Sequence, residues 1–164
     1  MPDDTRRIID ESLEAAVSLD EPNRVVTVAS WPVRAMVRSR DLRLSETVDK
    51  LLRIITDVGN PVRRADALAY LLDAVHPAGR PYRERVLAPL RRACRVMKSW
   101  KRSRHLRNVA CVLYPEDPDL AEAVLTDLSE NIFDRHDRQR LAQAKRRIRR
   151  KDNLGPQDFL ALQR

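Results

Sequence analysis

The chain has 164 residues, of which 43% are hydrophobic, and a formal net charge of +8. This length predicts a single domain, 1–164, that can bury a core without covalent staples. Two cysteines are too few for a disulfide framework and no apolar run is long enough to cross a bilayer, so we expect a cytoplasmic protein that does not enter a membrane.

Two helices are predicted near the N-terminus, over about 5–18 and 22–38, and they form a first helix pair over 5–40. Apolar residues in the first helix recur every three or four positions, which is the spacing of one helix face. Pro22 suits the first turn of the second helix. Pro32 lies inside that helix, where its missing backbone N–H predicts a kink or a split.

The next helix pairs are predicted over 45–76 and 81–114. In the pair over 45–76, Ser45 is a good N-cap for the first helix, and Asn60 followed by a proline opens the second. In the pair over 81–114, the first helix is predicted over about 81–98.

The last predicted pair covers 118–151. Asp117 followed by Pro118 is a strong helix-start signal, because an N-cap residue precedes a proline at the first helical position. The second helix of this pair has a thin apolar stripe, which suits a terminal helix and leaves open a homodimer through the C-terminal end. A short last helix is predicted in the tail, 152–164.

The helices form a weak repeat of about 38 residues. Leu68, Leu106 and Leu141 are 38 and 35 residues apart, and Val28 lies 40 residues before Leu68. No segment alternates between apolar and polar residues for long enough to be a strand. We therefore predict an all-α protein, an α-solenoid of about four antiparallel helix pairs with a short C-terminal helix.

The second predicted pair resembles a HEAT repeat. Asp57, Val62 and Arg63 match the Asp-x4-Val-Arg spacing across the turn of that repeat, and Pro89 resembles the proline found in the first helix of many such repeats. The resemblance implies that the side chains of Asp57 and Arg63 help to tie adjacent repeats together. A TPR-like superhelix is the nearest alternative, since helix pairs of about 35 residues fit it too. Neither resemblance implies catalytic residues.

The residues that carry most enzymatic chemistry are sparse. No two of the histidines, His76, His105 and His136, lie at the spacing of metal ligands, and Cys94 and Cys111 have no partner ligand nearby in sequence. Three glycines in the whole chain cannot make a phosphate-binding loop. We therefore expect no enzyme activity, no cofactor and no metal, and we interpret the two cysteines as small buried hydrophobic residues.

Positive charge is concentrated in the second half of the chain. Residues 1–79 carry 11 basic and 13 acidic side chains, a net charge of −2, whereas residues 80–164 carry 21 and 11, a net charge of +10. No acidic residue lies between Arg85 and Tyr114. The candidate binding residues are the basic side chains of this stretch: Arg91, Arg92, Arg95, Lys98, Lys101, Arg102, Arg104 and Arg107.

Three of these residues, Arg91, Arg95 and Lys98, are predicted to share one helix face at positions i, i+4 and i+7. Two interpretations of the basic stretch remain open: it binds nucleic acid through phosphates, or it meets an acidic protein surface. Because helical repeats usually present binding surfaces, we predict a non-enzymatic interaction module whose partner is another, unidentified protein. The alternative is binding of nucleic acid through the basic second half.

Overall fold

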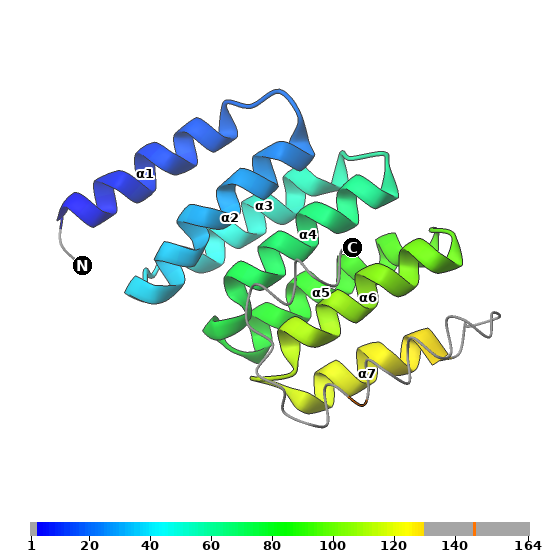
Figure 1. Cartoon of the computed structure of the whole chain (residues 1–164). Helices are drawn as coiled ribbons and strands as arrows, with labels where there is room; N and C mark the ends of the chain where they lie inside the picture. The colour runs from blue at the N-terminus through cyan, green and yellow to red at the C-terminus, as the bar shows by residue number, and fades with distance from the viewer. Residues whose placement is uncertain (1–2, 130–145, 147–164) are drawn as a thin grey trace. The chain divides into compact units, whose positions relative to one another are not determined.

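The computed structural model describes residues 3–129 and residue 146, and within these residues the chain is all-helical, with no strand (Figure 1). The second helix of the predicted pair 118–151, apart from residue 146, and the predicted tail helix of 152–164 lie outside the described residues. The helices are α1 (Asp3–Val17), α2 (Pro22–Ser39), α3 (Leu44–Thr56), α4 (Pro61–Val75), a 3-10 turn (His76–Ala78), α5 (Arg80–Arg95), α6 (Ser99–Leu113) and α7 (Pro118–Ser129).

The chain divides into two compact units, Met1–Ala93 and Cys94–Arg164, with the division falling inside α5. In the second unit α6 packs against α7. Leu106 and Leu113 of α6 are buried there, as are Val124 and Leu125 of α7. Cys94 and Cys111 of this unit form no disulfide. Cys94 is buried, and Cys111 is only half-buried.

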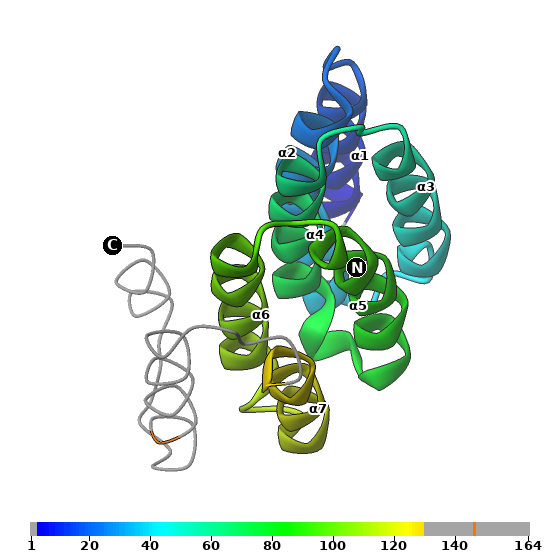
Figure 2. The same ribbon diagram turned by 90° about the vertical axis from the view of Figure 1, so that its right-hand side faces the viewer.

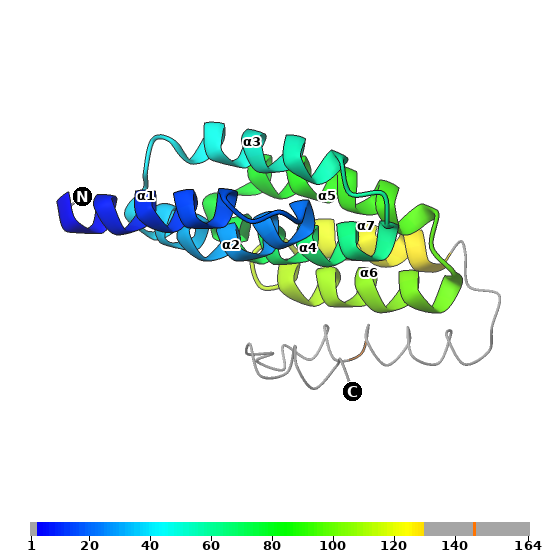
Figure 3. The ribbon, with the colours of Figure 1, turned by 90° about the horizontal axis from the view of Figure 1, so that it is seen from above.

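α2 is the central helix of the first unit. It packs against α1, α3 and α4, and its contact with α4 is the most extensive of the three. α3 lies to one side of α2 and α4, as two perpendicular views show (Figures 2 and 3). The buried face of α2 includes Ala29, Val33 and Met36, each completely buried. Leu68 and Leu71 of α4 are also completely buried, so this apolar contact supplies much of the stability of the unit.

The predicted repeat aligns Val28 with Leu68, and these two residues differ in burial. Val28 is 43% exposed, whereas Leu68, Leu106 and Ala29 are buried. The ion pair between Arg34 of α2 and Asp73 of α4 joins positions 39 residues apart. A separation of 39 residues aligns Leu68 of α4 with Ala29 of α2, and both of these residues are buried.

Helix starts follow the predicted capping residues in two cases of three. The side chain of Asn60 accepts hydrogen bonds from the backbone N–H groups of Val62 (3.0 Å) and Arg63 (3.3 Å) at the start of α4. Asp117 caps α7 by accepting from the backbone N–H of Leu120 at 3.1 Å. The predicted cap at Ser45 is wrong, because α3 begins at Leu44.

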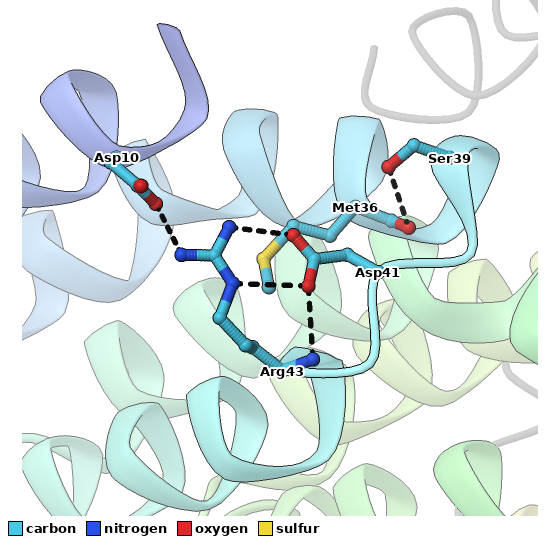
Figure 4. A network of polar contacts seen from close by, with 5 residues as sticks. All are labelled: Asp10, Met36, Ser39, Asp41 and Arg43. Atoms are coloured by element: carbon cyan, nitrogen blue, oxygen red, sulfur yellow. Dashed lines mark hydrogen bonds and ion pairs between the residues drawn. The ribbon is translucent and has the colours of Figure 1, made fainter. Parts of the chain in front are cut away.

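The turn between α2 and α3 explains this earlier start. Asp41 accepts three hydrogen bonds from Arg43, one from the backbone N–H (2.9 Å) and two from Nε (3.1 Å) and Nη2 (2.7 Å) of the guanidinium (Figure 4). Nη1 of Arg43 donates to Asp10 of α1 at 2.6 Å. The Asp41 side chain is only 6% exposed, and the hydrogen bonds from Arg43 hold the pKa of its carboxyl below the ordinary value. This network fixes Arg43 as the residue that precedes α3 and leaves Ser45 inside the helix.

The two prolines inside helices do not split them. α2 runs from Pro22 to Ser39 through Pro32, and α5 runs from Arg80 to Arg95 through Pro89. α2 ends where Arg40 adopts the left-handed conformation with φ 54°, and its backbone N–H bonds back to the carbonyl of Val37. A non-glycine residue in this conformation carries a local strain that the surrounding hydrogen bonds must offset.

The predicted extension of the fifth helix to residue 98 is wrong. α5 ends at Arg95, a turn follows in which the N–H of Met97 bonds to the carbonyl of Cys94, and Lys98 has the extended ψ of 146° as the N-cap of α6. Met97 is buried, with 7% exposure, while Val96 is 73% exposed. Met97 follows the buried Ala93 and Cys94 by four and three residues, so it reaches the core although the helix ends before it.

Ion pairs in the first unit join helices that are two apart in the chain order. They link α1 with the residue before α3 (Asp10–Arg43), α2 with α4 (Arg34–Asp73), and α3 with α5 (Asp49–Arg85). Another links the N-cap of α2 with the first turn of α4 (Glu21–Arg63, 3.7 Å). The partners are separated by 33 to 42 residues, about one predicted repeat. The ion pairs therefore connect each helix with the second helix after it in the chain, rather than with the next one.

Candidate interaction surfaces

Trp31 is the most exposed aromatic side chain among those the structure describes, with 69% of its surface accessible. It lies on α2 opposite Ala29 and Val33, which are two residues away on either side and therefore about 200° around the helix. Since those two residues face the core, the indole faces away from it. A large apolar ring that remains this exposed on a well-packed helix is typical of a surface that binds another molecule.

The indole of Trp31 is held by an arginine of the next helical turn. The guanidinium carbon of Arg34 lies 5.4 Å from the ring centroid, a cation–π distance. The same guanidinium forms an ion pair with Asp73 of α4. Because Arg34 is anchored on a second helix, the ring is held in place before any partner binds.

Tyr70 of α4 lies level with Trp31 across the contact between α2 and α4. Glu21 pairs with Arg63 near the starts of the two helices, and Arg34 pairs with Asp73 further along both of them. The two helices therefore run in the same direction. Tyr70 is one turn before Asp73, as Trp31 is one turn before Arg34, and the Tyr70 side chain is 47% exposed.

Ile8 of α1 extends this apolar surface to a third helix. It is 58% exposed, and it lies two residues before Asp10, whose carboxylate reaches Arg43 at the start of α3. A separation of two residues turns a side chain by about 200° around a helix, so Ile8 points away from α3. We call Ile8, Val28, Trp31 and Tyr70 together the Trp31 face.

The eight basic residues predicted as a binding site do not lie on one helix face. Arg91, Arg92 and Arg95 are on α5, with Arg91 half-buried and the other two exposed. Lys98 is the exposed N-cap of α6, so the predicted i, i+4, i+7 face of Arg91, Arg95 and Lys98 is interrupted by the turn that precedes it. The division between the two units separates Arg91 and Arg92 from the other six.

The basic residues of α6 fall on two sides of that helix. Lys101, Arg104 and Arg107 follow each other at intervals of three residues and share one side, with Arg104 exposed and the other two half-buried. Arg102 is about 200° from Arg104 around the helix axis. Arg91, Lys101, Arg104 and Arg107 all interact with other groups of the chain.

The end of α5 and the start of α6 differ in how their helix dipoles interact with positive charge. Arg91, Arg92 and Arg95 lie in the last turns of α5, where cations interact favourably with the negative end of the helix dipole. Lys98, Lys101 and Arg102 are at the start of α6, which has no acidic residue in its first turn. Cations at this end oppose the dipole, so the start of α6 is a region of concentrated positive potential.

The residues implied by the HEAT resemblance behave differently from each other. Arg63 reaches Glu21 at the start of α2, and so joins two helices that are about one repeat apart. Asp57 is the exposed C-cap residue of α3 and is not bonded to Arg63.

Across the part of the chain that the structure describes, no three histidine, cysteine, aspartate or glutamate side chains come together as a set of metal ligands. Within the same residues, no helix is both long and apolar enough to cross a membrane. Comparisons of the chain with protein-family models, with curated proteins and with solved structures found no match.

The Trp31 face was missed by the sequence analysis, although a signal for it exists. Arranged on a helix, residues 22–39 place Trp31 opposite Ala29 and Val33, between Arg24 and Arg38 at seven residues on either side. Val28, which the predicted repeat aligns with the buried Leu68, is also exposed on this side of α2.

Proposed function

We propose that this protein is a non-enzymatic, protein-binding module, built as an α-solenoid of antiparallel helix pairs that resemble HEAT repeats. The ion pairs of the first unit support the repeat architecture, because in a solenoid each helix contacts the equivalent helix of the next pair. Asp10–Arg43, Arg34–Asp73 and Asp49–Arg85 have this relationship.

The observation that carries the proposal is the exposure of Trp31. Tryptophan and arginine dominate the binding energy of protein interfaces, and they act best where the side chain is held before binding. Arg34 and Asp73 hold the Trp31 ring, and Tyr70 and Ile8 extend the apolar surface on the neighbouring helices. Such a row of exposed apolar side chains favours a protein partner.

Nucleic-acid binding is the second candidate function, favoured by the start of α6. Lys98, Lys101 and Arg102 gather there without an acidic residue in the first turn. Positive charge at a helix N-terminus attracts phosphate groups. Against this candidate, the basic residues of α6 are divided between two sides of the helix, which limits how many phosphates one strand could contact.

Two assays with the full chain test the proposal. In the first, the wild-type protein and the variants Trp31→Ala and Leu42→Ala are each immobilised. The proteins that bind to each of the three are then identified and compared. Leu42 is the matched control, since it is 98% exposed and lies outside the Trp31 face. We expect a set of proteins that is retained by the wild type and the control but lost with Trp31→Ala.

The second assay measures the fluorescence anisotropy of labelled single- and double-stranded DNA and RNA. Two results together would contradict the proposal. The first is that no retained protein depends on Trp31. The second is that nucleic acid binds at about 50 mM salt, that its affinity falls steeply by about 200 mM salt, and that changing Lys98 and Arg102 to Glu abolishes the binding.

A further inference from the structure

We propose that the Trp31 face binds a second copy of this chain, with α1 of each copy lying over α2 of the other. The inference rests on the proposed function, because it identifies the protein that occupies the face.

The charges of α1 and α2 are complementary. α1 carries five acidic and two basic residues, and α2 carries three basic and no acidic residues. Without Asp10 and Arg34, which pair with Arg43 and Asp73 of the same chain, the net charges are −2 on α1 and +2 on α2. Exposed acidic residues flank Ile8 of α1 at Asp4 and Glu11, about one turn away on each side. Exposed Arg24 and Arg38 flank Trp31 of α2. Opposite charges around an apolar centre favour contact between an α1 and an α2.

A twofold axis satisfies this complementarity on both sides of the contact at once. If the axis runs parallel to the helices and between α1 and α2 in the plane of the interface, rotation places each α1 over the α2 of the other copy. The interface is then isologous and closes at two copies, which is the commonest symmetry of soluble oligomers.

The apolar centres coincide in this arrangement. Four residues join α1 to α2, and the chain turns back between them, so the two helices run in opposite directions (Figure 1). Ile8 is nine residues before the end of α1 at Val17, and Trp31 is nine residues after the start of α2 at Pro22, which puts them at the same level. Rotation about an axis parallel to the helices leaves these levels unchanged. Ile8 of one copy therefore covers Trp31 of the other, and Asp4 lies within about one helical turn of Arg38. Among the described residues Arg38 pairs with no carboxylate, so its charge remains available.

The covered surface reaches the lower size limit of a specific interface. In this arrangement the contact covers α1 and α2, which contain 15 and 18 residues. Two such helices at a spacing of about 10 Å, each exposing about 25 Å of its length, present about 500 Å² on each copy, or about 1,000 Å² in total.

A nucleic acid fits the same face poorly. A duplex strand carries a phosphate about every 3.4 Å and would bring negative charge against α1, which carries five acidic residues and two basic ones. A second copy avoids this repulsion, because its α1 lies over the arginines of α2.

Sedimentation equilibrium of the full chain from about 1 to 100 µM tests the proposal. We expect the mass to approach that of two 19.0 kDa chains as the concentration rises. Trp31→Ala should raise the dimer dissociation constant by about 30-fold or more, as expected for a central aromatic side chain. Leu42→Ala, which removes an apolar side chain that is exposed outside the Trp31 face, should leave it unchanged. Circular dichroism spectra of the variants confirm that each remains helical.

A charge-swap series gives a readout that a loss of folding cannot imitate. Asp4→Arg and Arg38→Glu should each weaken the dimer by about five- to tenfold, and the double variant should restore most of the loss, because the charge pair is re-formed with reversed signs. The dissociation constant of the wild type should also rise with salt.

Three results would overturn the inference. A single mass of 19.0 kDa at every concentration would show that the face does not bind a second copy. A dimer that is insensitive to Trp31→Ala and to the charge variants would place the contact elsewhere, with the C-terminal end as the first candidate. A monomer that still retains another protein through Trp31 would end this inference while leaving the proposed function intact.

Discussion

The ion pair between Asp41 and Arg43 should make a measurable, pH-dependent contribution to stability, and Asp41→Asn is the perturbation that isolates it. The Asp41 carboxylate is 6% exposed and accepts three hydrogen bonds from Arg43, two of them from the guanidinium. Asparagine has one acceptor oxygen and would turn its NH2 group toward the guanidinium, so one charge-assisted bond is lost and another becomes weaker.

A charge-assisted hydrogen bond contributes about 1.5–3 kcal/mol, but Arg43 is one-third exposed and water replaces part of what is lost. We therefore expect Asp41→Asn to lower the free energy of unfolding at pH 7 by about 2 kcal/mol. Asp10→Asn is the matched control, because Asp10 binds the same guanidinium but is 48% exposed. Its loss should cost no more than about 1 kcal/mol.

The pH dependence of this contribution has a definite sign. The pKa of Asp41 in the folded protein is below its ordinary value near 3.9, so the unfolded chain binds a proton more readily than the folded one. The contribution is complete above about pH 5 and is lost as the pH falls below about 4 toward the folded-state pKa. Urea unfolding of the wild type and Asp41→Asn at several pH values measures it. A stability difference that stayed constant, or grew, below pH 4 would refute this reasoning.

Further predictions concern caps, core and surface, and urea unfolding checks each of them. Asn60→Ala should lower the free energy of unfolding by about 1 kcal/mol, since two N–H groups at the start of α4 lose their acceptor; an unchanged midpoint would contradict the cap. Leu68→Ala should cost about 2–5 kcal/mol because the side chain is completely buried. Trp31→Ala should cost clearly less than Leu68→Ala, and an equal cost would mean that Trp31 is a core residue. Arg40→Gly should be neutral or stabilising by up to about 1 kcal/mol, since Arg40 adopts a left-handed conformation; a clear loss of stability would contradict that assignment.

Helix positions were predictable from the sequence where strong local signals exist. Asn60 before a proline and Asp117 before a proline both begin helices as predicted, because capping depends on only a few neighbouring residues. The start of α3 was predicted wrongly although its main signal is local. Asp41 accepts three hydrogen bonds from Arg43, two residues away, whereas Asp10, 33 residues away, adds one further bond to the guanidinium.

The candidate surface was less predictable than the fold. The basic residues between Arg91 and Arg107 are exposed or half-buried, but the turn before Lys98 divides them between two helices. Met97 would face the core in a continued helix as well, so helix periodicity does not reveal the turn. Trp31 was missed because an apolar residue within a helical pattern is usually assigned to the core, and only its position relative to Ala29 and Val33 indicates otherwise.

Photo-crosslinking from position 31 tests most directly the claim that the Trp31 face binds a protein. Replacing Trp31 with p-benzoylphenylalanine keeps an aromatic side chain there and makes it reactive toward whatever lies against it, and the same replacement at Leu42 is the control. The account predicts a crosslinked product from position 31 and none from position 42, with the mass of two chains if the partner is a second copy. Equal crosslinking from both positions, or none from position 31, would contradict it.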